Sequence, residues 1–395
     1  MRAQNGPPNG PSTGPQGRPR TGPQAGSQTR SQTGRLGRPS PGTGAGPSES
    51  AGSAGSRTRP SPSITAHIRV DHYSAVQLAA SAARRTALDQ GLTGALPDQA
   101  AVLASELAGN VAKHAVHGSL YIQPLPLRPG VEILAVDRGP GMADVERCLT
   151  DGYTTTRTLG SGLGAVRRIA DEFTVRTKEG AGTVVCARLG EPGSSAADST
   201  TPGVGAVRVP ADGETACGDS WGLAVTGDVR TALVVDGLGH GAPASEAAEL
   251  AVRAFHRGAD QPLPQLMRSM NRALRRSRGA AVGLLRLTGD GVEHCSVGNV
   301  RAVLLAHDGI RHRFGGQPGV VGWNMPEPRV HRIPADSGAT ALLHSDGIDS
   351  RWTHAPTPFL TALPAPLLAG ALVHEYRRSR DDATVLTLGP ARRDA

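Results

Sequence analysis

Aromatic side chains are scarce in this sequence of 395 residues, in which Phe, Tyr and Trp together make up 3%. The four cysteines, at positions 148, 186, 217 and 295, form no Cys-x-x-Cys pair. Their scatter argues against a zinc site or a disulfide framework and is typical of a reducing compartment. No run of about 18 apolar residues occurs, so we expect a cytoplasmic protein without a membrane partner.

The first 62 residues lack large apolar side chains almost entirely and consist mainly of Gly, Pro, Ser, Thr, Gln and Arg. Such a segment cannot bury enough surface to offset its ordering entropy, so it is predicted to be a disordered tail. It also lacks the apolar core of about seven residues that a secretory signal needs.

Most of the positive charge belongs to this tail. The formal net charge is +8, yet eight arginines and a single acid, Glu49, lie within the first 60 residues, which leaves the rest of the chain near neutral. Arginine-rich tails bind polyanions in some proteins. This tail has no aromatic side chain to stack on bases, so a solvated tail is the preferred interpretation and a nucleic-acid partner is not expected.

The pattern of apolar residues divides the rest into two units. Helical spacing at 72–90, 96–115 and 163–173 accompanies strands at 119–125, 131–137, 173–179 and 182–189, with a short helix at 142–149, which indicates a first domain over 63–190. A Gly/Ser/Pro-rich linker covers 191–204. Seven strands and three helices then follow in a second domain over 205–390, and many strands with few helices favour a layered α+β fold.

A first group of polar and glycine residues fits a nucleotide with Mg²⁺. Glu106 and Asn110 share one face of the helix at 96–115 because they are four residues apart. They offer a general base and an oxygen ligand for Mg²⁺. Asp137 ends a strand as a carboxylate that can accept a hydrogen bond from an amino group. The glycines of this group precede free backbone amides or form a tight turn, as in an anion site; they are Gly139, Gly141, Gly160, Gly162 and Gly164.

The motifs ELAGNVAKHA, VDRGPGM, GSGLGAVRRIADEFTV and GAGTVVCARL, in this order, resemble the nucleotide-binding boxes of the GHKL ATPase superfamily. Within it they are most similar to the small serine kinases that act on anti-sigma-factor antagonists. The resemblance implies a Bergerat-type α/β sandwich of helices on one mixed sheet, with ATP and Mg²⁺ as cofactors. It also implies that Glu106 is the base, Asn110 holds Mg²⁺, Asp137 receives the adenine amino group with the help of Thr183, and the Gly160–Gly164 segment forms a lid hinge.

A second group consists of acidic residues at strand ends: Asp219, Asp236, Asp346 and the pair Asp381 and Asp382. Carboxylates at the ends of apolar strands are costly unless they meet a partner, and no basic residue accompanies them at regular spacing. Clustered carboxylates suit hard cations such as Mg²⁺ or Mn²⁺. Two such ions can activate a water molecule and bind a phosphate. A single Asp-Gly would indicate only a turn, whereas repetition at strand ends favours a metal site.

The motifs VVDGLGHG, SVGNVRAVL, PGVVG, HSDGID and DDAT are similar, in order, to those of PPM-type serine/threonine phosphatases of the SpoIIE subgroup. The resemblance implies an αββα sandwich with a dinuclear site between the sheets. Asp236 is then the catalytic bridging ligand, Gly237 binds through its carbonyl, and Asp346 and Asp381 complete one ion, with Asp382 as the alternative to Asp381. Asp219 acts through an intervening water, and His240 is either a proton donor or a turn residue.

Together the two resemblances imply a bacterial signalling switch with a metal-dependent serine/threonine phosphatase domain and an ATP-binding, serine kinase-like domain. The expected substrate is an anti-sigma-factor antagonist-like protein of the STAS type, and a sigma factor or an anti-sigma factor is a further candidate partner. In the alternative, the ATPase-like domain only binds ATP or sequesters a partner without transferring phosphate.

Overall fold

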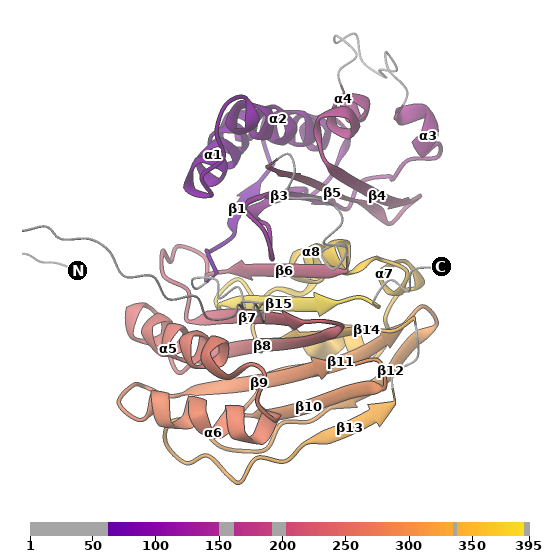
Figure 1. The fold of residues 1–395 in the computed structure, drawn as a ribbon. Coiled ribbons are helices and arrows are strands. Elements are labelled where there is room, and N and C mark those ends of the chain that lie inside the picture. The colour runs from indigo at the N-terminus through magenta and orange to yellow at the C-terminus, as the bar shows by residue number, and fades with distance from the viewer. Residues whose placement is uncertain (1–61, 150–161, 192–202, 335–337, 391–395) are drawn as a thin grey trace, which may run out of the picture. The chain divides into compact units, whose positions relative to one another are not determined.

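The computed structural model describes residues 62–149, 162–191, 203–334 and 338–390. Within these ranges the chain builds three five-stranded sheets and the helices that cover them, as Figure 1 shows. All of these residues belong to one compact unit, Gly55–Ala395. The predicted tail therefore lies outside the described residues except for its last position, and so does most of the predicted linker.

The first sheet has the strand order β1-β2-β3-β5-β4. Its strands are β1 (Ala66–Arg69), β2 (Ser119–Pro124), β3 (Gly130–Asp137), β4 (Glu172–Lys178) and β5 (Gly182–Gly190). All the neighbouring pairs among these strands are antiparallel, so the expectation of a mixed sheet is wrong. The turns between β2 and β3 and between β4 and β5 are short, and a short turn can join only antiparallel neighbours.

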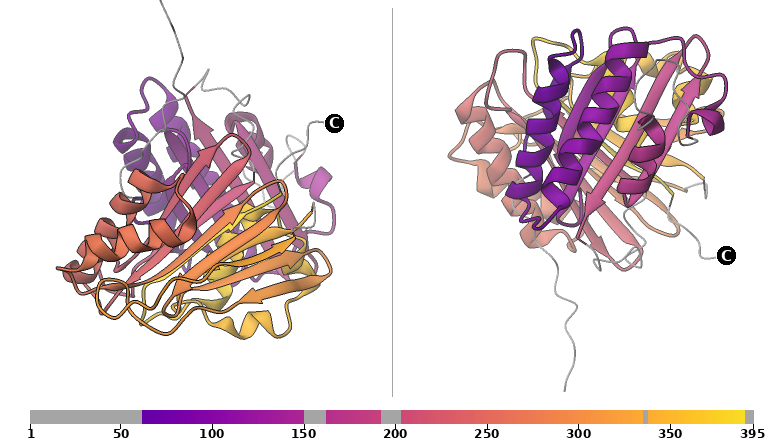
Figure 2. Two further views of the ribbon diagram at one scale, coloured as in Figure 1. Left: turned by 60° about the horizontal axis from the view of Figure 1, so that its bottom comes forward. Right: turned by 90° about the horizontal axis from the view of Figure 1, so that it is seen from above.

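Helices cover one face of this sheet. They are α1 (Ala75–Asp89), α2 (Leu96–His114) and α4 (Gly162–Ile169), and the view from above in Figure 2 shows α1 and α2 side by side across the strands. Alanines at Ala79, Ala83 and Ala87 recur every four residues and are fully buried. Small side chains at this spacing let α1 approach α2 closely, and the two helices share one hydrophobic cluster with β2, β3 and β5.

The remaining strands form two further sheets, with the orders β13-β10-β9-β8-β7 and β12-β11-β14-β15-β6. The first consists of β7 (Asp219–Thr226), β8 (Val229–Gly237), β9 (Ala280–Leu287), β10 (Gly291–Val297) and β13 (His331–Pro334). The second consists of β6 (Val204–Val209), β11 (Arg301–Ala306), β12 (Gly309–Phe314), β14 (Thr340–His344) and β15 (Ala383–Leu388). Their facing sides share a hydrophobic cluster, which makes them a sandwich.

Helices pack on the outer faces of this sandwich. The pair α5 (Ala242–Gly258) and α6 (Leu263–Leu274) lies on the sheet that contains β8, as the left view of Figure 2 shows. The apolar helix α8 (Ala365–Tyr376) packs on β6 and β15 of the other sheet, and nine of its twelve residues are buried. Three short helices complete the described elements: α3 (Val145–Cys148), η1 (Ser350–Thr353) and α7 (Pro358–Thr361). The expected layered α+β architecture with an αββα second half is confirmed.

Four strands were not expected from the sequence: β1, β6, β12 and β13. Each lies at the edge of its sheet. An edge strand needs only one partner, and β1, β12 and β13 each expose part of their length, so their apolar alternation is weak; β6 is instead buried at all six residues. The polar stretch GIRHRF of β12 and the proline that ends β13 illustrate this. The predicted helices at 163–173, 262–277 and 365–379 also end earlier than expected, at Ile169, Leu274 and Tyr376.

The strands before and after the predicted linker are joined by buried polar contacts. Arg188 on β5 donates through Nη2 to the carbonyl oxygen of Val204 on β6 at 2.7 Å, and the backbone amide of Thr65 donates to the carbonyl of Arg208 at 2.8 Å. Helix α8 contributes to the same hydrophobic cluster as β3 and β5. No helix among the described residues is long and apolar enough to cross a membrane.

Candidate functional site

Glu106 and Asn110 lie one turn apart on α2, and both side chains are half-buried. The amide nitrogen Nδ2 of Asn110 is buried, and no described atom is its hydrogen-bond partner. A buried amide donor without a partner costs about 1–3 kcal/mol, so such a group indicates a position at which a ligand or water completes the contacts. Glu106, the predicted base, and Asn110, the predicted Mg²⁺ ligand, thus share one helix face, and the side-chain amide of Asn110 lacks a hydrogen-bond partner among the described residues.

The turn after Asp137 packs against the C-terminal end of the same helix. The backbone amide of Gly139 donates to Asp137 Oδ1 at 2.7 Å, and a Cβ atom at Gly139 would lie only 3.1 Å from the Cα of Ala115. Gly141 has φ +77°, and a Cβ atom there would lie 2.4 Å from the carbonyl oxygen of Lys178. Both glycines are therefore required for the close backbone packing that this turn adopts.

Asp137 and Thr183 are direct partners in the register of β3 and β5. Burial raises the pKa of Asp137, while the amide of Gly139 and a second backbone hydrogen bond from Thr183 oppose the shift. Thr177, which sequence reasoning missed, joins this group: its hydroxyl lies 3.0 Å from the Thr183 hydroxyl and accepts from the amide of Met142 at 2.9 Å. The threonine pair fixes the turn that contains Gly141, and only the register of β4 on β5 brings the two hydroxyls together.

The glycine-rich segment is described only in part. Gly162 begins α4 with open space around it, and Gly164 is buried in the first turn. Gly160 lies outside the described residues. Helix α4 packs on α2, so the described glycines belong to the same face of the sheet as Glu106 and Asn110. The residues fit a nucleotide by their chemistry: an unpartnered amide, a carboxylate at a strand end and glycines that allow a close backbone approach.

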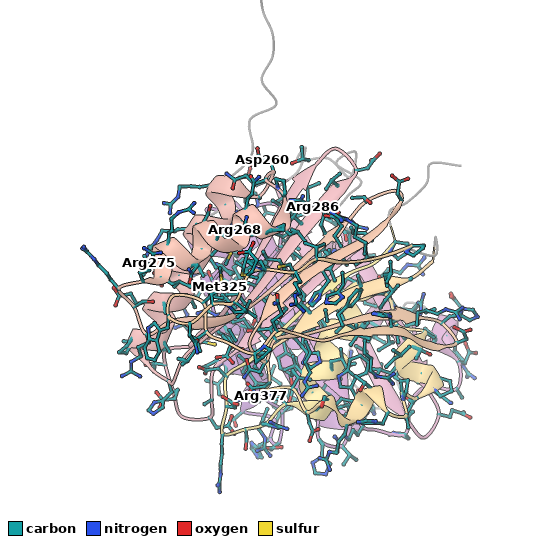
Figure 3. All side chains as sticks on the ribbon, turned by 90° about the horizontal axis from the view of Figure 1, so that it is seen from below. Asp260, Arg268, Arg275, Arg286, Met325 and Arg377 are labelled. Atoms are coloured by element: carbon teal, nitrogen blue, oxygen red, sulfur yellow. The ribbon has the colours of Figure 1, made fainter. Side chains whose placement is uncertain are left out.

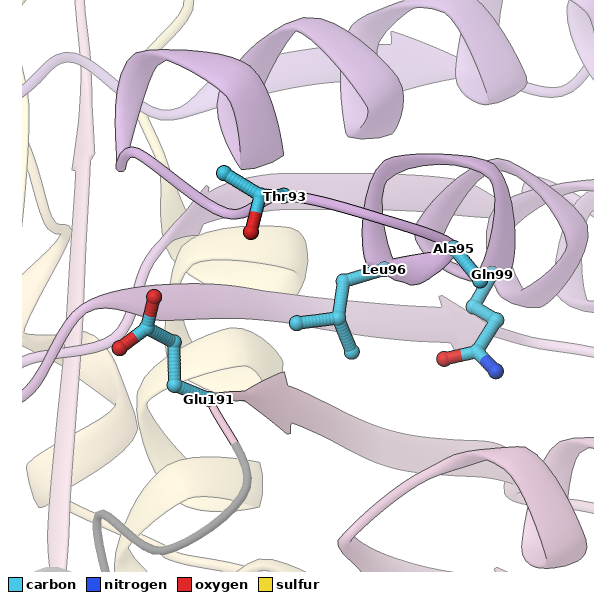
Figure 4. A pocket seen from close by; sticks show the side chains of 5 residues that line it. All are labelled: Thr93, Ala95, Leu96, Gln99 and Glu191. Atoms are coloured by element: carbon cyan, nitrogen blue, oxygen red, sulfur yellow. The ribbon is translucent and has the colours of Figure 1, made fainter.

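A separate cavity of about 570 Å³ opens at the start of α2 and is lined by Thr93, Ala95, Leu96, Gln99 and Glu191, as Figure 4 shows. Leu96 precedes Glu106 by ten residues, which is about 15 Å along a helix. The cavity therefore contains none of the residues predicted to bind a nucleotide.

In the sandwich half, the predicted carboxylates come from both sheets. Asp219 and Asp236 face each other as direct partners in the antiparallel pair β7 and β8. Asp346 follows β14, and Asp381 precedes β15, its neighbour in the other sheet. The hydroxyl of Ser345 donates to Asp219 Oδ2 at 2.5 Å and accepts from the amide of Thr384 at 3.0 Å. This serine connects the two sheets directly at the carboxylate cluster.

Burial and neighbouring carboxylates raise the pKa of three members of this cluster. Burial is the largest cause of the raised pKa of Asp236, and the charges of Asp219, Asp346 and Asp381 add to it. Burial likewise raises the pKa of Asp219, and burial together with Asp346 raises that of Asp381. Buried carboxylates whose ionised form is disfavoured, as at Asp219, Asp236 and Asp381, need protons or cations among them.

This donor set fits divalent cations by its chemistry, because hard cations prefer carboxylate and carbonyl oxygens. Among the residues that the structure describes, however, no group of three His, Cys, Asp or Glu side chains is arranged to hold one ion.

Asp381 and Asp382 have different surroundings. The carboxylate of Asp382 accepts from the amides of Ala211 at 2.8 Å and Gly218 at 2.6 Å, so both of its oxygens already have partners. The charge of Asp346 instead contributes to the raised pKa of Asp381, after burial, and the Asp381 side chain is only half-buried. Asp381 thus has the more exposed carboxylate, but both residues adjoin the cluster, since the charge of Asp382 contributes to the raised pKa of Asp219.

Three further residues surround the Asp236 turn. Asn299 donates through its side-chain amide to Asp346 Oδ2 at 2.7 Å. A Cβ atom at Gly237 would lie 2.2 Å from the carbonyl oxygen of Ala244, so only glycine fits between β8 and the start of α5. His240 is exposed in the turn before α5. Asn299 was missed as a positioning group because its partner is 47 residues away in the chain.

Two family models match the chain. Residues 68–189 match the histidine kinase-like ATPase domain, and residues 227–389 match stage II sporulation protein E (SpoIIE). Among curated proteins, the chain is 39% identical over 83 residues to the serine/threonine-protein kinase RsbT of Bacillus subtilis (strain 168), a match that covers 20% of this chain and 62% of the relative.

A second curated relative from the same strain, phosphoserine phosphatase RsbX, is 27% identical over 143 residues, which is 35% of this chain and 70% of the relative. A solved structure of RsbX in complex with magnesium is similar with a TM-score of 0.42 and 22% identity, covering 47% of this chain and 93% of that chain. The family matches occupy separate parts of the sequence in the order of the two candidate sites. The chain therefore contains a region similar to histidine kinase-like ATPase domains, followed by a region similar to SpoIIE.

Proposed function

We propose that this chain is a signalling switch that hydrolyses phosphoserine or phosphothreonine on a partner protein. The cluster of Asp219, Asp236, Asp346 and Asp381 at the ends of strands from two sheets carries the proposal. Two divalent ions, Mn²⁺ or Mg²⁺, would supply the charge that neutralises the phosphate and lowers the pKa of a water molecule. In the hydrolysis, the water oxygen forms a new bond to phosphorus, the bond to the serine oxygen breaks, and that oxygen takes up a proton.

Each residue of the cluster has a distinct part in this proposal. Asp236, Asp346 and Asp381 would hold the ions together with the carbonyl oxygen of Gly237, and the ions would supply positive charge beside the phosphate. Asp219 acts through an intervening water. The Ser345 hydroxyl donates to the Asp219 carboxylate and so holds that side chain in place. Asn299 orients Asp346 through its amide.

The test is hydrolysis of p-nitrophenyl phosphate with Mn²⁺. Asp236→Asn and Asp346→Asn should each reduce the rate by at least about a hundredfold, because each removes a charge from the ion-binding cluster. Asp228→Asn is the matched control. Asp228 is exposed in the turn between β7 and β8, at the opposite end of the strands from Asp219 and Asp236. Full activity in both cluster variants would contradict the proposed site.

We further propose that the other half binds ATP with Mg²⁺ and transfers its γ-phosphoryl group to a serine or threonine of an anti-sigma-factor antagonist-like protein. Glu106 accepts the proton of the attacking hydroxyl, and Asn110 holds Mg²⁺. Asp137 with Thr183 binds the adenine amino group, and Gly139, Gly141, Gly160, Gly162 and Gly164 give the backbone access to the nucleotide. In this proposal the kinase-like domain comprises residues 63–190 and the phosphatase domain residues 205–390, with the linker 191–204 between them and the tail 1–62 before them.

Labelled ATP distinguishes transfer from sequestration. In the kinase case, label appears on an antagonist-type domain and is lost with Glu106→Ala. A stable complex without label would instead support the alternative, in which the ATPase half only binds a partner, a sigma factor or an anti-sigma factor included.

In this proposal one half phosphorylates a protein and the other half dephosphorylates one, so the ratio of the two reaction rates must be regulated. We propose that ATP sets it through the buried contacts between β5 and β6. Phosphatase rates that stay the same from zero to saturating ATP would contradict this coupling.

A further inference from the structure

Trp323 stands out because the chain has three tryptophans and few other aromatics. Its side chain is 64% exposed, whereas Trp352 is buried and Trp221 half-buried. A single exposed apolar side chain is common on protein surfaces, and Tyr73 is 62% exposed as well, but aromatic side chains are enriched at protein interfaces. The residues around Trp323 decide whether it belongs to an interaction surface.

The loop that carries Trp323 is fastened to the phosphatase half at several points. The indole Nε1 donates to the carbonyl of Ser277 at 3.2 Å. The amide of Gly322 donates to Asn271 Oδ1 on α6 at 2.6 Å, and Val321 exchanges two backbone hydrogen bonds with Ala280 at 2.9 and 3.0 Å. The indole is thus held in place while its face remains open to solvent.

This loop adjoins the carboxylate cluster. Ala280, which binds Val321, is the direct partner of Gly237 in the pairing of β8 and β9. The amide of Leu238 donates to the carbonyl of Gly279 at 3.1 Å. A protein bound over Trp323 would therefore lie beside the turn that holds Asp236 and Gly237.

The surface next to Trp323 is basic. Arg275, Arg276 and Arg278 follow the end of α6, all are exposed, and none forms a salt bridge with a residue that the structure describes. The guanidinium of Arg278 covers Gly239, since a Cβ atom there would lie 2.7 Å from Arg278 Nη1.

Figure 3 shows Arg268, Arg275 and Met325 on the side of the molecule seen from below. The one acid in the Trp323 loop, Glu327, is already paired with Arg268.

We infer that Trp323 with Arg275, Arg276 and Arg278 forms the docking surface for the substrate protein of the phosphatase, and that this surface selects an acidic segment around the phosphoserine. Three guanidinium groups that have no anionic partner among the described residues complement a segment rich in Asp or Glu, and complementary charge favours encounter and register. The indole supplies a rigid apolar anchor. The inference rests on the proposed phosphatase activity and identifies the substrate chemistry of the same site.

Two synthetic phosphoserine peptides of equal length test it, one flanked by Glu and one by Lys, alongside p-nitrophenyl phosphate. The full chain should hydrolyse the Glu-flanked peptide with a kcat/KM at least about tenfold above that of the Lys-flanked peptide. Arg275→Glu/Arg276→Glu should abolish or reverse this preference. Trp323→Ala should raise KM for both peptides by about tenfold with kcat within twofold. Hydrolysis of p-nitrophenyl phosphate should stay within twofold in both variants, since neither variant alters the cluster.

The matched control is Arg253→Glu/Arg257→Glu, which makes the same charge change near the end of α5. That end of the helix is about 20 Å from its start beside Gly237. The control should keep the peptide preference of the parent chain.

Two results would overturn the docking surface. In the first, the Arg275/Arg276 variant keeps the peptide preference while p-nitrophenyl phosphate is hydrolysed normally. In the second, the same variant loses retention of single-stranded RNA while its peptide kinetics are unchanged, which would assign the surface to nucleic acid. Absence of p-nitrophenyl phosphate hydrolysis by the parent chain would overturn the phosphatase activity itself, and the docking surface with it.

Discussion

Replacing Arg188 by methionine should destabilise the protein strongly, because it leaves a buried carboxylate without its cation. Arg188 is 1% exposed and its partner Glu132 is fully buried. The guanidinium donates to Glu132 through Nε at 2.7 Å and lies 2.6 Å from it through Nη2, and it also reaches Glu172 and the carbonyl of Val204. Burial alone would lower the pKa of Arg188, but Glu132, Cys186 and Glu172 together hold the pKa above its usual value.

The magnitude follows from what remains after the substitution. Glu132 keeps one amide donor, Gln123 Nε2 at 2.7 Å, but loses both contacts with the guanidinium. Removing one partner of a buried pair costs about 3–5 kcal/mol, since the other charge stays buried without compensation. We expect a loss in this range in the free energy of unfolding from urea titrations followed by circular dichroism.

Two further variants make the test specific. Arg84→Met breaks an exposed pair with Asp98 at the similar distance of 2.9 Å, and it should cost less than about 1 kcal/mol because solvent already screens that pair. The double variant Glu132→Leu/Arg188→Met removes both buried charges and should be more stable than Arg188→Met alone by about 2 kcal/mol or more. The reasoning is refuted if Arg188→Met costs no more than Arg84→Met, or if the double variant is the least stable of the set.

Two other predictions concern the dependence of stability on pH and the turn that contains Gly141. His294 is buried and neither of its ring nitrogens has a partner among the described residues; burial, and then His331 and His312, lower its pKa to about 3 from 6.5. Below pH 6.5 the unfolded chain therefore binds a proton that the native protein does not. The free energy of unfolding consequently decreases as the pH is lowered. Between pH 7 and 5 the parent should lose about 2 kcal/mol more than His294→Phe, while the exposed control His354→Phe should keep the slope of the parent; equal slopes for His294→Phe and the parent would contradict the assignment. Gly141 and Gly180 have similar φ values, +77° and +73°, but only at Gly141 would a Cβ atom collide, 2.4 Å from Lys178 O. Gly180→Ala should thus cost about 1 kcal/mol from φ alone, and Gly141→Ala clearly more, with weaker binding of a fluorescent ATP analogue; equal costs in thermal melts would argue against close packing at this turn.

The linear pattern alone predicted much of the fold. Helices with apolar residues three and four apart, such as those at 72–90 and 96–115, correspond to α1 and α2, because amphipathic periodicity is a local property that a buried face imposes on its own segment. The Asp-Gly turns at strand ends were equally visible, since an apolar strand that runs into a carboxylate is a local pattern. Edge strands such as β12 and β13 were missed because only their neighbours define them.

The tertiary structure alone decided how distant residues meet. The register of β7 on β8 brings Asp219 opposite Asp236, and the two sheets place Ser345 on Asp219 although 126 positions separate them in the chain. The amides of Ala211 and Gly218 likewise donate to the carboxylate of Asp382 from 171 and 164 positions away in the chain. Sequence spacing contains no information on such pairs, because strand register and sheet packing depend on the whole core.

The same holds for Glu132 and Arg188, which look like ordinary surface charges in the sequence and become a buried pair only when β3 and β5 align. By itself, then, the sequence determined which residue types end each strand, and so the chemistry available to each half. Only the fold determined which of those residues share a site, because hydrogen bonds and ion pairs between distant segments form once their strands are in register and water has been excluded.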